Sequence, residues 1–236
     1  MKVPALLYHK IDLPTPDVKI RGAFTAPRKF ERQIAYLKRK GYEFYTASEL
    51  IEFYRANGEF PRRSLAITFD DGWKDNYVHA FPVLKKYGAK ATVFLVTSCI
   101  GETSDKVTAE GEGPREHLSE NDIREMSAGG IEFDSHSSSH SLFHQIGEDQ
   151  IEREVTESKK IIENLTQKEC AVFAYPAGYF TDFAKKAIEK AGYAAAFSTC
   201  YGDEENFDIY SLNRVEILRR DSYPFRFGSK IKSIYK

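Results

Sequence analysis

The sequence predicts an α/β fold in which parallel strands alternate with helices. Short β-branched or aromatic runs alternate seven times with helical patterns along the 236 residues, which is the element order of a parallel α/β protein. These runs are apolar nearly throughout, as in strands that are buried on both faces. An open doubly wound sheet and a closed barrel both fit this order. Seven strands in this length, with polar residues at successive strand ends, favour a small barrel.

Each expected strand is a short apolar run that ends in a polar or turn-forming residue. No linker, internal repeat or low-complexity tract separates these runs, so we expect one domain over residues 1–236. In a barrel, the functional site is built from the loops that follow the carboxyl ends of the strands. The expected strands are residues 5–9, 65–71, 91–96, 131–136, 171–176, 194–199 and 215–218.

The expected helices begin and end at recognisable signals. Pro27 suits a first helical turn, and Thr46 with Glu49 and Ser119 with Asp122 resemble capping boxes. Glycines follow several of the helices, as C-terminal stops do. The expected helices are residues 27–40, 47–56, 74–87, 120–128, 148–165 and 182–190, and the basic, aromatic tail 219–236 is expected to form a solvated final helix.

Composition excludes several classes of protein. The 34 Lys and Arg residues nearly balance the 35 Asp and Glu residues, so nothing indicates a nucleic-acid-binding protein. Three cysteines without a Cys-x-x-Cys pair form neither a disulfide framework nor a thiolate zinc site. No apolar run approaches the roughly 20 residues of a membrane span. The amino terminus is typical of a first strand rather than a signal peptide, so we expect a cytoplasmic protein.

Two polar clusters follow expected strands and point to metal chemistry. Asp70 and Asp71 precede Gly72 at the end of one strand, and His136 and His140 follow another. Alone, the first cluster is typical of a turn. The two histidines share one face if their segment is helical. Two imidazoles and a carboxylate suit zinc first, and also iron, cobalt, nickel or manganese, and three protein ligands leave a position open for water.

The adjacent carboxylates require a bend in the chain. Consecutive residues of a strand point to opposite faces, so the strand must bend at Asp70 and Asp71 for both to reach one site. Gly72 permits such a bend.

In combination, these motifs resemble the polysaccharide deacetylase family (NodB homology, carbohydrate esterase family 4). The family's Thr-Phe-Asp-Asp motif matches residues 68–71, and its His-Ser/Thr-x-x-His motif matches residues 136–140. A third motif, Phe-Ala-Tyr-Pro-x-Gly, matches residues 173–178 and is similar to the poly-N-acetylglucosamine deacetylase branch. Several spaced motifs in the correct order are far more specific than any one of them.

The resemblance implies a deformed (β/α)7 barrel and the hydrolysis of N-acetyl groups from an amino sugar. It implies that Asp70 is the general base and that one divalent metal ion is bound by Asp71, His136 and His140. In the third motif, Tyr175 and Pro176 lead to Ala177, whose backbone N–H would help to stabilise the oxyanion. The implied partner is a carbohydrate that carries an N-acetyl amino sugar.

The sequence departs from the family pattern at three places. The third motif lacks the arginine that orients the catalytic aspartate; Arg214 could replace it, or could be an ordinary surface residue. The C-terminal histidine motif is absent, which leaves His9 as the expected general acid, although a lone histidine at a strand end is often structural. Ala177 stands where the branch often has an aromatic residue, which leaves the identity of the sugar open.

Other residues carry weaker expectations. Trp73 either stacks on a sugar ring or packs at the rim, and His79, His117 and His144 are expected to be structural or exposed. The long polar loop 101–114 is a surface loop or a lid. The basic tail could contact anionic lipid, which would suit a lipid-linked sugar and a peripheral location at the inner face of the membrane. Two alternative functions are an imide or cyclic-amide hydrolase and a carbohydrate-binding pseudoenzyme.

Overall fold

The computed structural model describes residues 3–16, 18, 21–104, 114–199 and 207–235. Its strands are β1 (Ala5–Tyr8), β2 (Glu43–Tyr45), β3 (Ser64–Phe69), β4 (Thr92–Leu95), β5 (Thr103–Ser104), β6 (Arg115–Glu116), β7 (Glu132–Ser135), β8 (Val172–Ala174), β9 (Ala195–Ser198), β10 (Leu212–Asn213) and β11 (Val215–Glu216). Its α-helices are α1 (Pro27–Arg39), α2 (Ala47–Asn57), α3 (Phe81–Tyr87), α5 (Glu120–Ala128), α6 (Glu148–Thr166), α7 (Asp182–Lys190) and α8 (Pro224–Ile234).

The strands form a near-closed parallel barrel, which confirms the predicted fold class. The order along the main path is β10-β9-β8-β7-β4-β3-β1-β11. The two ends of this path, β10 and β11, are separated only by Arg214, and they pair with β9 and β1 respectively. β10 and β11 therefore act as one interrupted strand that completes the ring, so the barrel has seven strand positions. β2 pairs with the first half of β3, whereas β4 pairs with Thr68 and Phe69 in its second half. The insertion of β2 beside β3 deforms the barrel.

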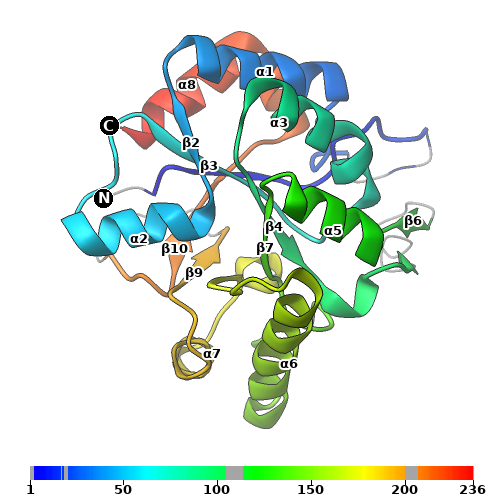
Figure 1. Cartoon of the computed structure of the whole chain (residues 1–236), viewed down its shortest axis with the longest axis vertical. Helices are drawn as coiled ribbons and strands as arrows, with labels where there is room; N and C mark the ends of the chain where they lie inside the picture. The colour runs from blue at the N-terminus through cyan, green and yellow to red at the C-terminus, as the bar shows by residue number, and fades with distance from the viewer. Residues whose placement is uncertain (1–2, 17, 19–20, 105–113, 200–206, 236) are drawn as a thin grey trace.

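Alternate residues of each strand form two apolar clusters on opposite faces of the barrel wall. The larger cluster includes Ile67, Val93 and Phe173, which pack against the surrounding helices. The smaller cluster includes Phe94 and Phe197 and fills the interior. Figure 1 shows α1, α3 and α8 on one side of the strands and α6 and α7 on the opposite side. This burial on both faces explains why the strands read as continuous apolar runs.

Helix α2 covers the amino-terminal end of the barrel. The backbone N–H of Ala47 donates to Thr92 Oγ1 over 2.8 Å, and the N–H of Ser48 donates to Glu132 over 3.3 Å. Thr92 and Glu132 are the first residues of β4 and β7. The helix amino terminus also favours the negative charge of Glu132. The opposite end of the barrel, where the strands finish, is therefore the end that remains for the site.

The helix boundaries follow their signals closely. The two expected capping boxes are present, Thr46 with Glu49 and Ser119 with Asp122, and α2 ends at Gly58, whose φ of 72° is left-handed. The helix expected over residues 74–87 is interrupted by a π-helical segment, Asn76–Ala80. Pro82 lacks the N–H that an α-helix would use there, and the wider turn accommodates it.

Three expectations about the fold were wrong in detail. The final helix is not solvated throughout, because Phe227, Ile231 and Ile234 of α8 are buried in the larger cluster. The last strand starts earlier than residue 215 and is broken at Arg214. The short strand β2 and the β5–β6 hairpin were not expected. Residues 105–113, which include most of the proposed lid, lie outside the described residues.

Within the described residues, no helix combines the length and the apolar character needed to cross a bilayer.

Candidate active site

The chain bends sharply directly after β3, as the adjacent carboxylates require. Asp71 and Gly72 both adopt left-handed backbone angles, with φ of 73° and 71°. A side chain at Gly72 would place its Cβ 2.7 Å from Leu95 Cδ2, so Leu95 would have to shift, and the left-handed φ also favours glycine there. A left-handed aspartate costs about 1 kcal/mol. This bend turns Asp70 and Asp71 toward the same end of the barrel.

The histidine segment after β7 forms a tight loop instead of the helical turn that was considered. Ser137 and His140 have φ of 68° and 59°, which no helix contains. Glu154 of α6 shapes the loop: its carboxylate accepts the backbone N–H of Ser139 over 2.7 Å and the hydroxyl of Ser139 over 2.5 Å. Ser137 Oγ accepts the N–H of His140. The loop, held by α6, brings His140 back beside His136.

Asp71, His136 and His140 form a group suited to one metal ion. One ligand atom from each residue lies within 4.8 Å of the others. Asp71 Oδ1 is 3.6 Å from His136 Nε2 and 3.5 Å from His140 Nε2. His136 Nδ1 is 2.7 Å from the carbonyl oxygen of Ala174, so its N–H donates there and Nε2 is left to bind a metal. This donor set fits a divalent ion with an open coordination position.

Asp70 lies beside this group and is held by Arg214. The Arg214 Nη1 and Nη2 atoms donate to Asp70 Oδ1 and Oδ2, each over 2.7 Å. Arg214 is 2% exposed, lies over the Phe94 ring and also donates to Thr68 Oγ1. It is therefore a buried partner of Asp70 and not a surface residue. Burial opposes ionisation of Asp70, but Arg214 and His136 outweigh it and lower the pKa of Asp70 below its usual value.

Trp73 is built into the support of Asp71. Its indole Nε1–H donates to Asp71 Oδ2 over 2.9 Å. The His117 ring stacks on the indole with a centroid separation of 4.2 Å, and the Lys10 ammonium lies 4.6 Å from the ring centroid. With 6% of its surface exposed, Trp73 offers little surface to a sugar ring. Its burial favours the packing alternative for Trp73, and the buried His117 packs against it.

The third motif contributes backbone instead of side chains. Tyr175 is fully buried and its hydroxyl donates to the carbonyl of Tyr210 over 2.9 Å, so its side chain does not reach a substrate. The short turn Pro176–Gly178 follows, in which Ala177 is exposed and has a left-handed φ of 52°. Ala177 thus presents backbone at the surface after β8, and its role with the oxyanion stays a prediction.

His9 also lies at this end of the barrel. It follows β1, its carbonyl accepts from Asn76 Nδ2 over 3.0 Å, and its charge contributes to lowering the pKa of both Asp70 and Asp71. Its buried Nδ1 atom has no hydrogen-bond partner among the described residues. His9 is therefore near the carboxylates, while its role as an acid stays a prediction. His144 is exposed and its ring contacts Tyr179, outside the metal group.

Sequence reasoning missed two supporting residues. Glu154 is 6% exposed and reaches the histidine loop from α6, fifteen residues away from Ser139. Ala174 supplies the carbonyl that orients His136. A glutamate on the buried face of an expected helix was the available signal for Glu154. Nothing in the sequence could have indicated the carbonyl.

Comparisons with known proteins identify the family of the chain. Residues 57–196 match the family model described as polysaccharide deacetylase. A Bacillus subtilis protein named as a polysaccharide deacetylase, YxkH, is 32% identical over 92% of this chain and 71% of its own length. The poly-β-1,6-N-acetyl-D-glucosamine N-deacetylase of Staphylococcus aureus is 31% identical over 76% of this chain, and the match spans 62% of that enzyme.

A solved structure gives the same result for the fold. The Streptococcus pyogenes deacetylase PplD, determined in complex with acetate, superposes with a TM-score of 0.83 and 28% identity, and the match covers 98% of each chain. The family match covers more than half of this chain, and the B. subtilis relative is matched over most of its length. The chain therefore belongs to the polysaccharide deacetylase family.

Proposed function

We propose that this protein is a metal-dependent hydrolase that removes N-acetyl groups from an amino-sugar-containing carbohydrate. The observation that carries the proposal is the arrangement at the barrel mouth. An Asp70 carboxylate clamped by Arg214 lies within 3.8 Å of His136, and His136 belongs to the group with Asp71 and His140. A binding protein needs no buried, oriented base beside a metal site, which argues against the pseudoenzyme alternative. The names of the relatives support the substrate class.

Each residue has a defined part in the proposed reaction. A divalent ion held by Asp71, His136 and His140, with zinc as the first candidate, would polarise the amide carbonyl and acidify water. Asp70 takes the proton of the attacking water on a carboxylate oxygen. Arg214 holds both oxygens of Asp70 in place, and the Ala177 N–H donates to the developing oxyanion. His9 donates a proton to the leaving amine, so that acetate and a free amino sugar are the products.

The test is acetate release from N-acetylglucosamine oligomers and from lipid-linked N-acetylated sugars. We expect release that is lost after chelation and restored by Zn²⁺, Co²⁺, Ni²⁺, Mn²⁺ or Fe²⁺ to different degrees. A parallel assay with a cyclic imide as substrate distinguishes deacetylation from the alternative imide hydrolase activity. Activity that is unaffected by complete metal removal would refute the proposal. Imide hydrolysis without acetate release would show that the protein is an imide hydrolase instead of a deacetylase.

A further inference from the structure

Basic charge is concentrated on one side of the molecule, over α1 and α8. Residues 27–40 and 219–235 contain eleven Lys and Arg side chains against two acidic ones, Glu31 and Asp221. Both of these already pair, with Lys86 and Lys230. The rest of the chain carries 23 basic and 33 acidic residues. Although the net charge of the protein is −1, its positive charge is therefore concentrated on α1 and α8.

The same side exposes large apolar side chains. Phe225 is 87% exposed and Tyr223 is 66% exposed, at the first turn of α8 and directly before it. They adjoin the exposed side chains of Arg219, Arg220 and Arg226. We define the α1–α8 surface as Arg28, Lys29, Arg32, Arg39, Arg219, Arg220, Tyr223, Phe225 and Arg226.

The groove between the two helices makes this surface continuous. The helices pack through Tyr36 and Phe227, whose ring centroids are 6.0 Å apart. Beside this contact lies a cavity of about 270 Å³, with Lys29, Arg32 and Arg39 among its lining residues. A second cavity, of about 230 Å³, also borders Lys29 and continues to Arg219 and Tyr223. The two hollows thus run between the exposed arginines, and the one acidic residue that lines them, Asp12 in the second, is paired with Arg115.

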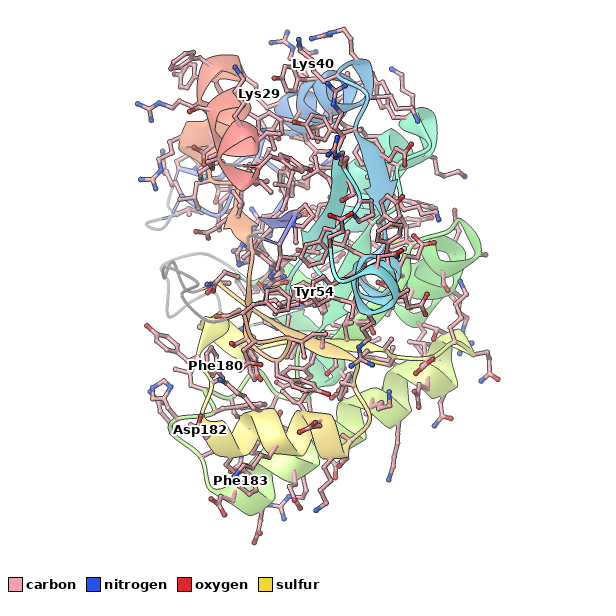
Figure 2. All side chains as sticks on the ribbon, turned by 90° about the vertical axis from the view of Figure 1, so that its left-hand side faces the viewer. Lys29, Lys40, Tyr54, Phe180, Asp182 and Phe183 are labelled. Atoms are coloured by element: carbon pink, nitrogen blue, oxygen red, sulfur yellow. The ribbon has the colours of Figure 1, made fainter. Side chains whose placement is uncertain are left out.

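This surface adjoins the mouth of the barrel. α1 follows β1, and the segment 219–222 follows β11, so both begin at carboxyl ends of strands. Figure 2 shows Lys29, at the start of α1, on the same side of the molecule as Phe180 and Asp182, which precede and begin α7. A partner held on the α1–α8 surface would therefore lie beside the candidate active site.

We propose that the α1–α8 surface docks onto an anionic lipid bilayer. Arginine and lysine side chains bind phosphate headgroups, while Phe225 and Tyr223 enter the interface, where aromatic rings are stabilised. A soluble anionic polymer would need the basic residues but not an almost fully exposed phenylalanine. That difference favours the bilayer. The docking is independent of the proposed reaction; only its consequence, a carbohydrate substrate close to the membrane, rests on the proposed function.

Vesicle co-sedimentation of the full chain tests the proposal. We expect the protein to bind vesicles of phosphatidylcholine and phosphatidylglycerol and not vesicles of phosphatidylcholine alone. Arg220→Glu combined with Arg226→Glu should weaken binding by roughly fivefold or more per charge, and Phe225→Ser by roughly tenfold. These residues are exposed, so acetate release from soluble oligomers should be unchanged.

Matched controls lie on α6 and α7, which are across the strands from α1 and α8 (Figure 1). Arg153→Glu combined with Lys186→Glu reverses two exposed charges, and Ile161→Ser removes an exposed apolar side chain; neither should alter vesicle binding. Absence of binding to anionic vesicles would overturn the proposal. The proposal would also be overturned if Phe225→Ser bound vesicles as well as the wild type does and polyphosphate displaced the protein from vesicles completely. That result would assign the surface to anionic polymers.

Discussion

Asp70 and Asp134 are two carboxyl groups of the same barrel, and each is 1% exposed or less. Asp70 is clamped by the Arg214 guanidinium, and its pKa is lowered although burial acts in the opposite direction. Asp134, on β7, accepts one backbone N–H from Val172. Burial and the charge of Glu132 raise the pKa of Asp134 well above its usual value. Equal burial therefore goes with opposite shifts of the pKa, and the neighbouring charges decide the direction: the Arg214 cation at Asp70 and the Glu132 anion at Asp134.

The comparison separates a reactive carboxylate from a structural one. Asp70 stays ionised at the mouth, where it can accept a proton beside the metal group. Asp134, whose pKa is raised, accepts the N–H of Val172 on a neighbouring strand. The predictions below test whether this distinction, and not burial itself, determines what each acidic residue does.

The largest effect is expected for Asp70→Asn. The amide cannot take a proton from water, so kcat for acetate release should fall by about 10²–10⁴-fold. Asp134→Asn is the matched control, because it makes the same replacement at an equally buried carboxyl on β7 that lies outside the metal group; its kcat should equal that of the wild type. A folded Asp70→Asn variant with more than about a tenth of the wild-type rate would contradict the role of a general base.

The next largest effect is expected for Arg214→Met. The substitution leaves Asp70 buried without its cation, and breaking a buried pair in this way costs about 3–5 kcal/mol of the free energy of unfolding. Urea denaturation measures the change. The double variant Arg214→Met with Asp70→Asn removes the unpaired charge and should recover part of the loss. Equal stabilities of the single and double variants would show that the pair does not determine the state of Asp70.

A smaller effect is expected for Trp73→Phe. Phenylalanine keeps the apolar body but loses the indole N–H that donates to Asp71. Partners that orient metal ligands typically contribute 10–100-fold to metal affinity, so titration calorimetry with Zn²⁺ should show a weakening in this range. His144→Ala is the control, since His144 lies outside the metal group. Unchanged affinity in Trp73→Phe would leave Trp73 with a packing role only.

The sequence indicated most of the fold because its central strands are buried on both faces. Six of the seven expected strands, and the expected helices other than 74–87 and the final one, appear within a few residues of their predicted bounds. The three-residue strand β2 and the break at Arg214 were not predicted, because such short segments have too few residues to show a periodic pattern of apolar side chains. The interruption depends on tertiary contacts, since Arg214 turns inward to reach Asp70.

The site was predictable where its residues are neighbours in sequence. The pairs Asp70–Asp71 and His136–His140 are each local, and the bend at Gly72 follows from the geometry of a strand. The contacts of Glu154 with Ser139 and of Arg214 with Asp70 join distant segments. Local patterns do not encode such pairings, and the positioning of Trp73 against Asp71 depends on packing by His117 and Lys10.

The smallest effect concerns Asp75, a buried carboxyl that extends the comparison. Its Oδ1 accepts the N–H of Ile11 over 2.8 Å. Burial raises the pKa of Asp75 to about 7, and the nearby charge of Asp12 adds to this, against the opposing effects of Ile11, Arg115 and Lys10. The native state therefore holds this proton more tightly than the unfolded chain, where an aspartate has a pKa of about 3.9. Protonation of Asp75 stabilises the fold most at low pH.

Stability measured against Asp75→Asn isolates this contribution, because asparagine keeps the acceptor and cannot ionise. The difference in free energy of unfolding, wild type minus variant, should fall as pH rises from about 4 to about 7, by at most about 1.4 kcal/mol per pH unit, and then level off. Both proteins are measured with chelator, so that metal release does not contribute. A difference independent of pH would mean that Asp75 titrates normally although it is buried. The contrast between Asp70 and Asp134 would then need a cause other than burial and the neighbouring charges.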